Sequence, residues 1–308
     1  MKKNVLKFQV PVKKQVRMIV DCDCKNEADD QFALAHHLMT PMFDVKGIIA
    51  AHFEMANKRT GGPETTMQAS YDEIMLMLDL MDLKDDYPVY KGAVRAMTDE
   101  VTPVDSEGAR FIIEEAMKDD PRPLFIGVQG SITNLASALL IEPKIADKIT
   151  AIWIGGDEYP KGGWEFNLFQ DIHAANVVFA SKCGLWQVPK PVYKLLNISL
   201  SELQYRVAPC GRVGEYLFRQ MVELNDKLGN AEWPHGETWC IGDQPTVGLL
   251  LEDKQRLDNY TMKKAPRVAP DGSYIEVPEN REIRVYHNTD VRLTLEDFYA
   301  KLALYYGE

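Results

Sequence analysis

The chain has 308 residues and a formal net charge of −11, with hydrophobic residues at 45% and charged residues at 26%. This composition is typical of a globular protein and excludes collagen, coiled coil and extended disorder. The negative charge excludes a general nucleic-acid binder, because such a protein needs a basic surface to displace counterions from phosphates. We therefore expect a small-molecule partner and no nucleic acid.

The five cysteines are too few and too scattered for a disulfide framework, so we expect reduced thiols in a cytoplasmic protein. The apolar run of residues 6–12 is interrupted by Lys7 and Gln9, which does not fit a secretory signal. No stretch approaches the roughly 20 apolar residues of a membrane-spanning helix. We therefore expect no membrane partner.

Short apolar runs typical of strands alternate along the chain with amphipathic stretches typical of helices. The expected strands are residues 16–20, 45–51, 124–128, 149–154 and 185–188, and the expected helices are 71–81, 110–117, 134–141 and 295–306. Strands that are apolar throughout are buried on both faces, and their alternation with helices indicates parallel βαβ units. The sequence predicts a single α/β domain over residues 1–308, with a mostly parallel central sheet flanked by helices. We expect residues 252–290 to form a surface excursion.

A cluster of five acidic residues follows the first expected strand directly: Asp21, Asp23, Glu27, Asp29 and Asp30. Asp21 and Asp23 share one side of that strand because strand side chains alternate, and the last two acids open the next helix. So many carboxylates repel one another unless a cation lies among them, and hard oxygen ligands favour Ca²⁺ or Mg²⁺ over zinc. A solvated acidic loop with a helix cap is the plain alternative. Function collects at the carboxyl ends of strands in such sheets, which favours the metal site.

Three later segments also place polar residues beside expected strands and helices. Gln129 and Gly130 follow the third strand, Glu165 and Asn167 follow the fourth, and Asp243 precedes an apolar helix. Each has a plain interpretation as a turn or a helix cap. A carboxylate and an amide two residues apart can nevertheless both bind hydroxyl groups of a ligand.

Together these four segments resemble the nucleoside hydrolase family, the inosine-uridine preferring N-ribohydrolases, in the same order and along nearly the whole chain. The family opens with a strand, D-x-D, a loop and DD before a helix, and this loop is two residues longer here. It continues with G-x-L-T-N-hydrophobic-A, a GG pair followed by E-F-N, and a late aspartate. The matching positions are Asp21, Asp23, Asp29, Asp30, residues 130–136, residues 155–156, residues 165–167 and Asp243.

The resemblance implies a nucleoside-hydrolase-like fold with a Rossmann-like sheet. It implies a calcium-dependent hydrolase that cleaves the N-glycosidic bond of ribonucleosides to free base and ribose. The implied ligands of Ca²⁺ are Asp23, Asp30, Asp243 and the backbone carbonyl of Gln129. Asp23 is then the general base on the bound water, and Asp29 orients this nucleophile. Ribose is bound by Asp29, Glu165 and Asn167. The family also implies a homodimer or homotetramer.

The sequence departs from the best-known members around the leaving group. Those members place a histidine just before the late aspartate, where it protonates the leaving base, and here that position is Gly242. Trp239 is a candidate to stack on the base and raise its basicity, or a packing residue only. The alternative acids and neighbours of the substrate are His52, Glu54 and His235.

The two extra residues of the first loop, Asn26 and Glu27, lie beside the expected metal and are candidates for substrate contact. Two rival functions stay open. One is a riboside-binding protein that kept the calcium site and lost turnover, which the missing histidine favours. The other is a metal-dependent phosphatase of the haloacid-dehalogenase-like type, which also opens with D-x-D. Its later acid pattern is not matched, since Val247 stands where the last aspartate is expected.

Overall fold

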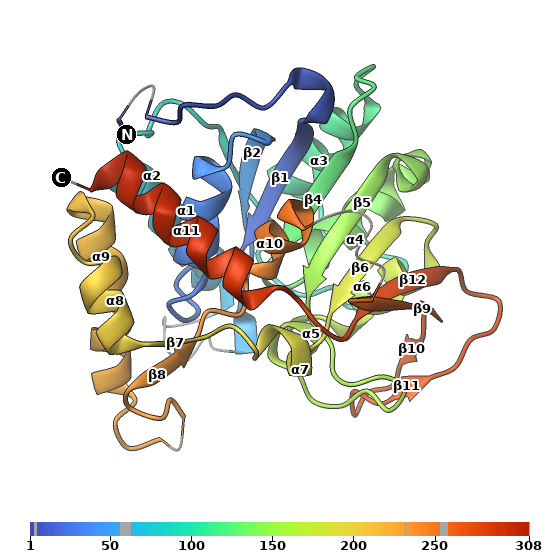
Figure 1. Cartoon of the computed structure of the whole chain (residues 1–308). Helices are drawn as coiled ribbons and strands as arrows, with labels where there is room; N and C mark the ends of the chain where they lie inside the picture. The colour runs from blue at the N-terminus through green and yellow to red at the C-terminus, as the bar shows by residue number, and fades with distance from the viewer. Residues whose placement is uncertain (3–4, 56–62, 232, 253–257, 308) are drawn as a thin grey trace.

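The computed structural model of the chain describes residues 1–2, 5–55, 63–231, 233–252 and 258–307. Its centre is an eight-stranded sheet with the strand order β3-β2-β1-β4-β5-β6-β12-β9 (Figure 1). All neighbouring strands are parallel except β12 and β9, which are antiparallel. These strands are β1 (Val16–Cys22), β2 (Phe43–Ala50), β3 (Val89–Lys91), β4 (Leu124–Val128), β5 (Ile149–Ile154), β6 (Gly184–Val188), β9 (Tyr260–Lys264) and β12 (Glu282–Tyr286). The expected α/β fold with a mostly parallel sheet is confirmed.

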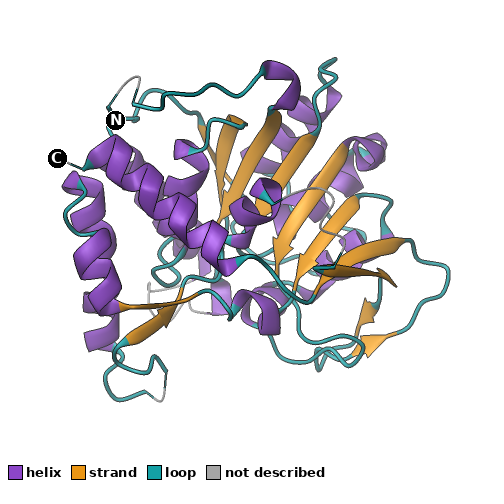
Figure 2. Ribbon diagram, in the orientation of Figure 1, coloured by secondary structure: helices purple, strands orange, loops and turns teal. Residues whose placement is uncertain are grey.

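Helices cover both faces of this sheet (Figure 2). Helices α1, α10 and α11 contact one another on one face, and α3, α4 and α6 form a contiguous row on the other. The helix bounds are α1 (Asp30–Met39), α2 (Pro63–Leu80), α3 (Glu107–Met117), α4 (Thr133–Ile141), α5 (Phe166–Gln170), α6 (Ile172–Ala180), α7 (Lys190–Tyr193), α8 (Leu200–Arg206), α9 (Gly211–Lys227), α10 (Pro245–Leu251) and α11 (Val291–Tyr306). The expected helices coincide with α2, α3, α4 and α11.

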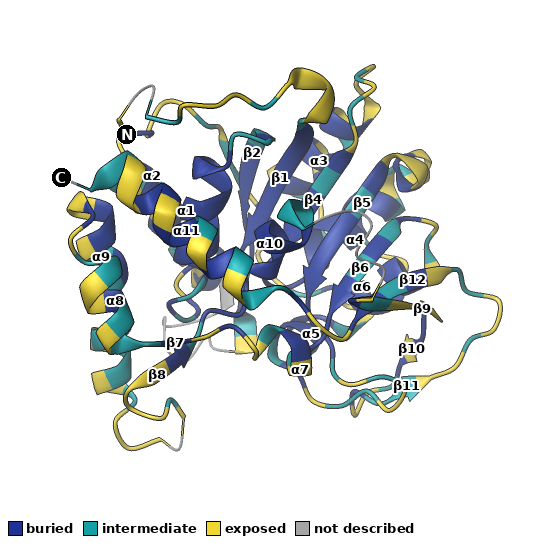
Figure 3. Cartoon of the chain, viewed as in Figure 1, coloured by how far each residue is buried: buried dark blue, intermediate teal, exposed yellow. Residues whose placement is uncertain are grey.

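Strand β1 shows why the apolar runs predicted the sheet so well. All seven of its residues are buried (Figure 3). Met18 and Val20 pack into the core on the α1 side, whereas Ile19 packs into the core on the α3 side. A central strand of a sheet covered on both faces has no polar side, so its sequence is mostly apolar, and in β1 the buried charged residues are confined to Arg17 and Asp21 near its two ends.

Residues 252–290 are not only the surface excursion expected from the sequence, because part of this segment belongs to the central sheet. β9 and β12 from this segment extend the central sheet, and a small sheet of β10 (Arg267–Val268) and β11 (Tyr274–Ile275) lies between them in the chain. Residues 253–257 of the segment lie outside the described residues. β9 is an edge strand with mostly exposed side chains, so it lacks the apolar pattern that marks a buried strand.

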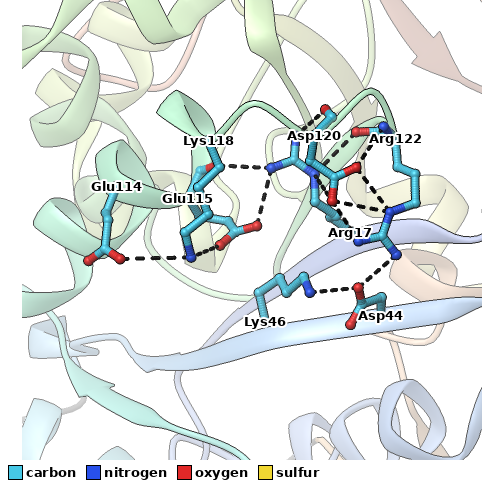
Figure 4. A network of polar contacts seen from close by, with 8 residues as sticks. All are labelled: Arg17, Asp44, Lys46, Glu114, Glu115, Lys118, Asp120 and Arg122. Carbon is cyan, nitrogen blue, oxygen red and sulfur yellow. Dashed lines mark hydrogen bonds and ion pairs between the residues drawn. The ribbon is translucent and has the colours of Figure 1, made fainter.

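The amino ends of β1 and β2 carry a network of paired charges (Figure 4). Arg17 of β1 is 4% exposed and contacts Glu115 through Nη1 and Oε1 at 3.2 Å. Arg122 contacts Asp120 at 2.6 Å and Asp44 of β2 at 2.7 Å. Every charge in this network faces a charge of opposite sign.

Two further observations bear on the predictions. The five cysteines are free thiols, as expected. Within the described residues, no helix is long and apolar enough to cross a membrane.

Candidate active site

Four loops at the carboxyl edge of the sheet meet around one cavity of about 320 Å³. They are the loop from β1 to α1, the end of β4, the segment that enters α5, and the loop before α10. The lining residues are Asp23, Asn26, Glu27, Asp29, Asp30, Gln129, Ile154, Glu165, Phe166, Asn167, Tyr193, Gly242 and Asp243. The structure therefore brings together all four expected metal ligands and three of the expected ribose contacts. We call this space the ribose cavity, after the sugar that the resemblance to nucleoside hydrolases implies.

The carboxylate of Asp23 has no hydrogen-bond partner among the described residues, although both of its oxygen atoms are buried. Burial and the neighbouring acids, Asp29 first among them, hold the pKa of Asp23 well above its usual range. A Cβ atom at Gly130 would lie 2.5 Å from the Asp23 carboxyl carbon, so glycine is the residue that leaves room for this side chain. An orphaned carboxylate in such a position is costly unless it has a ligand.

Asp29, Asp30 and Asp243 form a group in which one carboxylate oxygen of each residue lies within 4.8 Å of the other two. Asp30 accepts a hydrogen bond from the backbone N–H of Asp23 at 3.0 Å, and Asp29 accepts one from Gly242 at 3.0 Å. Burial raises the pKa of all three, that of Asp29 to about 6. The first bond closes the acidic loop after β1 on itself, and the second joins that loop to the loop before α10.

The donors around the ribose cavity fit a hard metal cation. Six carboxyl side chains line the cavity: Asp23, Glu27, Asp29, Asp30, Glu165 and Asp243. None of the described residues that line the cavity carries a positive charge, so the lining itself supplies no cation to these carboxyl groups. A dense set of oxygen ligands with one orphaned carboxylate is the environment that Ca²⁺ or Mg²⁺ requires.

Glu165 is buried and accepts four hydrogen bonds. Oε2 accepts from the backbone N–H groups of Gly156 and Leu168, each at 2.8 Å. Oε1 accepts from the Asn167 N–H at 3.1 Å and from the Tyr193 hydroxyl at 3.0 Å. Glu165 thus caps α5, and it places Asn167 at the cavity.

Asn167 joins two strand ends, because its Nδ2 donates to the carbonyls of Gln129 at 2.8 Å and of Ile154 at 2.9 Å. The Gln129 carbonyl, expected as a metal ligand, therefore already accepts one hydrogen bond. A carbonyl oxygen has two lone pairs, so the second stays available to a cation.

Asp21 does not line the cavity, although the sequence predicted that it shares one side of the strand with Asp23. Its carboxylate instead accepts hydrogen bonds from Nδ2 of Asn134 at 3.1 and 3.3 Å. β1 ends at Cys22, so the alternation of a regular strand does not extend to Asp23.

A second cavity of about 940 Å³ adjoins the first, and we call it the aglycone cavity. Asn26, Glu27, Asp29, Phe166, Tyr193 and Gly242 line both. The remaining lining residues are Trp164, Lys190, Lys194, Trp233 and Cys240. The extra residues of the first loop, Asn26 and Glu27, thus line both cavities, and their contact with a substrate stays a prediction.

Trp239, the expected stacking residue, lies elsewhere. Its indole ring is 1% exposed and packs in the core, and it lines neither cavity. The small sheet of β7 (Asn197–Ser199) and β8 (Thr238–Cys240) turns Trp239 inward, while the next residue, Cys240, lines the aglycone cavity. Trp164 and Trp233 line this cavity instead, and the ring centre of Trp233 lies 4.9 Å from that of Trp239.

The alternative acids expected from the sequence also lie away from both cavities. His52 is fully buried, and its Nε2 contacts the Thr133 hydroxyl at 2.8 Å. That hydroxyl donates to Asp171, so His52 supports the turn that begins α4. Burial lowers the pKa of His52 to about 3. Glu54 accepts a hydrogen bond from the Ala96 N–H at 3.0 Å, and His235 is exposed.

Tyr193 fills the space beside Gly242, and the sequence did not predict that Tyr193 belongs to the site. A Cβ atom at Gly242 would lie 2.9 Å from Cδ2 of Tyr193. The tyrosine ring therefore occupies the position that a side chain at residue 242 would need. No local sequence signal marks Tyr193, because its place depends on how α7 packs against the loop before α10.

Comparison with known proteins identifies the family. Residues 18–296 match the inosine-uridine preferring nucleoside hydrolase family. The chain belongs to this family. It is accordingly a hydrolase that acts on N-glycosyl compounds.

Named relatives of this nucleoside hydrolase differ in their substrates. The pyrimidine-specific ribonucleoside hydrolase RihA of Salmonella arizonae is 28% identical over 265 residues, which is 76% of this chain and 79% of RihA. The structure of a purine-preferring ribonucleoside hydrolase from Gardnerella vaginalis has a TM-score of 0.75 at 20% identity, covering 94% of this chain and 99% of that one. An inosine-guanosine nucleoside hydrolase has a TM-score of 0.71 at 17% identity, covering 94% and 98%. At these identities the structural neighbours show the fold alone.

Proposed function

We propose that this chain is a calcium-dependent N-ribohydrolase that cleaves a nucleoside or another riboside to the free base and ribose. The orphaned carboxylate of Asp23, set among five other carboxyl groups, carries the proposal. Family membership supports the type of bond that is cleaved. The named relatives prefer either pyrimidine or purine ribonucleosides, so they leave the base open.

The groups that would hold Ca²⁺ are the carboxylates of Asp23, Asp30 and Asp243 and the carbonyl of Gln129. Bound Ca²⁺ lowers the pKa of a water molecule and binds ribose hydroxyl groups. The side chain of Asp29 lies beside those of Asp30 and Asp243, and one of its oxygen atoms accepts a hydrogen bond from the Gly242 N–H. It is therefore positioned to orient the attacking water and to accept a hydrogen bond from ribose.

The remaining catalytic roles belong to side chains of the protein. Asp23 takes the proton of the attacking water as the general base. Asn167 binds a ribose hydroxyl, while Glu165 holds the Asn167 segment in place and adds negative charge beside the ribose. Negative charge around an oxocarbenium-like ribose stabilises the transition state of glycosidic cleavage.

Release of ribose tests this proposal. The purified chain with Ca²⁺ is incubated with inosine, uridine, cytidine, adenosine, guanosine and nicotinamide riboside, and free ribose is measured. We expect ribose from at least one substrate, lost with EDTA and with Asp23→Asn. Asp44→Asn is the matched control, because it removes an aspartate at the opposite edge of the sheet and leaves the cavity intact.

Tight riboside binding without ribose release would support the alternative of a binding protein, which the glycine at position 242 favours. Absence of calcium binding would refute the proposed metal site. The dimer or tetramer implied by the resemblance and the cytoplasmic location expected from the cysteines stay predictions.

A further inference from the structure

We propose that the preferred substrate is a riboside with a cationic aglycone, a pyridinium-type ring whose charged nitrogen forms the glycosidic bond. The inference rests on the proposed ribohydrolase function and concerns the aglycone cavity. When the bond from ribose to such a nitrogen breaks, the electron pair stays on nitrogen and cancels its charge. Water adds its oxygen to the ribose carbon, Asp23 takes the proton, and the ring leaves as a neutral molecule. No proton has to be delivered to the leaving group.

The proton donors nearest to Gly242 are engaged elsewhere. The Tyr193 ring fills the space beside Gly242, and its hydroxyl donates to Oε1 of Glu165 at 3.0 Å. The Cys240 thiol donates to the Tyr193 backbone carbonyl at 3.4 Å. A neutral purine or pyrimidine leaves with an extra electron pair and gains from a general acid, whereas a cationic ring does not.

The charge of the cavity walls favours a cation. Glu27 and Asp29 line the side shared with the ribose cavity, where the carboxyl cluster continues. Lys190, which also lines the cavity, contacts Asp157 and the Trp164 carbonyl, so its charge is compensated within the protein. Lys194 is exposed at the rim. Two carboxyl groups therefore line the part of the aglycone cavity that adjoins the ribose cavity.

Aromatic rings complete the cavity and are suited to a flat cation. Trp164, Phe166, Tyr193 and Trp233 line it. The faces of such rings attract cations, and most strongly those of tryptophan. Trp164 already takes part in such a contact, since the Lys190 ammonium lies 5.8 Å from its ring centre.

The test compares nicotinamide riboside, which is cationic, with the neutral nucleosides inosine and uridine, using the full chain with Ca²⁺. We expect the highest kcat/KM for nicotinamide riboside. Because this substrate is intrinsically more reactive, the deciding measurement is the effect of variants on each substrate. Glu27→Gln should lower kcat/KM for nicotinamide riboside about tenfold and for inosine and uridine less than about twofold.

Lys194→Gln is the matched variant at the same cavity, because it removes a charge of the opposite sign. It should raise the ratio of kcat/KM for nicotinamide riboside to that for uridine. Thermal unfolding of both variants shows whether they are folded.

The outcomes separate the two proposals. If inosine or uridine is cleaved faster, or if Glu27→Gln slows all substrates equally, the cationic-substrate inference fails and the ribohydrolase function stands. If no riboside releases ribose although Ca²⁺ binds, the proposed function and the inference both fail.

Discussion

Buried charge is arranged differently at the two ends of strand β1. At the amino end Arg17 is 4% exposed and donates to Oε1 of Glu115 and to the backbone carbonyls of Glu115, Asp120 and Arg122 (Figure 4). Just beyond the carboxyl end Asp23 is 1% exposed, and neither oxygen has a partner among the described residues. The two regions lie on one strand and differ in whether the protein itself neutralises the charge.

This difference indicates that the buried charges at the amino end of β1 have a structural role and that those at its carboxyl end have a functional role. A paired network gains little net free energy, but breaking it is costly because the remaining partner stays buried and charged. A cluster of like charges destabilises the fold and is retained where a ligand compensates it. The following changes should affect the two ends of β1 in opposite ways.

The largest effect is expected for Asp23→Asn at the carboxyl end. It removes the proposed general base and should lower kcat by about 10³-fold. In EDTA the same variant should unfold at a higher temperature than the wild type, because it removes a buried carboxyl group whose pKa is raised by burial. Ribose release and thermal unfolding measure the two effects. A variant that is both inactive and less stable in EDTA would contradict this assignment.

Breaking the charge network at the amino end of β1 should lower the free energy of unfolding and leave the rate of ribose release unchanged. Arg17→Met leaves the Glu115 carboxylate, which is 1% exposed, with Lys118 as its remaining ionic partner. We expect a loss of about 3 kcal/mol in the free energy of unfolding, measured by urea denaturation. The double variant Arg17→Met with Glu115→Leu should recover part of this loss, because it also removes the buried carboxylate that has lost its arginine. A loss below about 1 kcal/mol in the single variant would show that the pair is not important.

Calcium should stabilise the folded protein through the acidic cluster at the carboxyl end of β1, and not through the charge network at its amino end. At a concentration 100 times its dissociation constant, a ligand of the folded state adds about 2.7 kcal/mol to the free energy of unfolding. We expect this gain in the wild type and in Arg17→Met, and its loss in Asp243→Asn. Thermal unfolding with Ca²⁺ and with EDTA measures it. An equal gain in Asp243→Asn would place the ion elsewhere.

The gain from calcium should shrink as the pH falls. In the absence of metal the pKa of Asp29 is raised to about 6, so below that pH this neighbour of the proposed ligands holds a proton, which the charge of a bound cation would drive off. The gain should fall by about 1.4 kcal/mol per pH unit for each proton displaced. Buried His37 and His52 have a pKa lowered to about 3, so they weaken the fold below their ordinary pKa of 6.5. They act equally with and without Ca²⁺, and therefore cancel in the difference. The same gain at pH 8 and pH 5 would contradict this prediction.

Much of the site could be predicted because its residues lie in short loops directly after strands. Asp23, Asp29 and Asp30 share one loop, and the parallel sheet brings that loop to the edge where Gln129 and Asp243 also lie. The aromatic part could not be predicted in the same way. Whether Trp233 or Trp239 faces the cavity depends on the pairing of β8 with β7, a three-residue contact without a periodic pattern.

The sequence by itself determined the parallel α/β fold, the reduced cysteines and the acidic cluster. Continuous apolar runs, few cysteines and adjacent acids are local features that need no partner to be recognised. Only the tertiary structure decided that β9 and β12 complete the sheet, that Asp21 bonds Asn134, and that Tyr193 fills the space beside Gly242. These outcomes depend on contacts between segments far apart in the chain, where packing and not local pattern selects the neighbour.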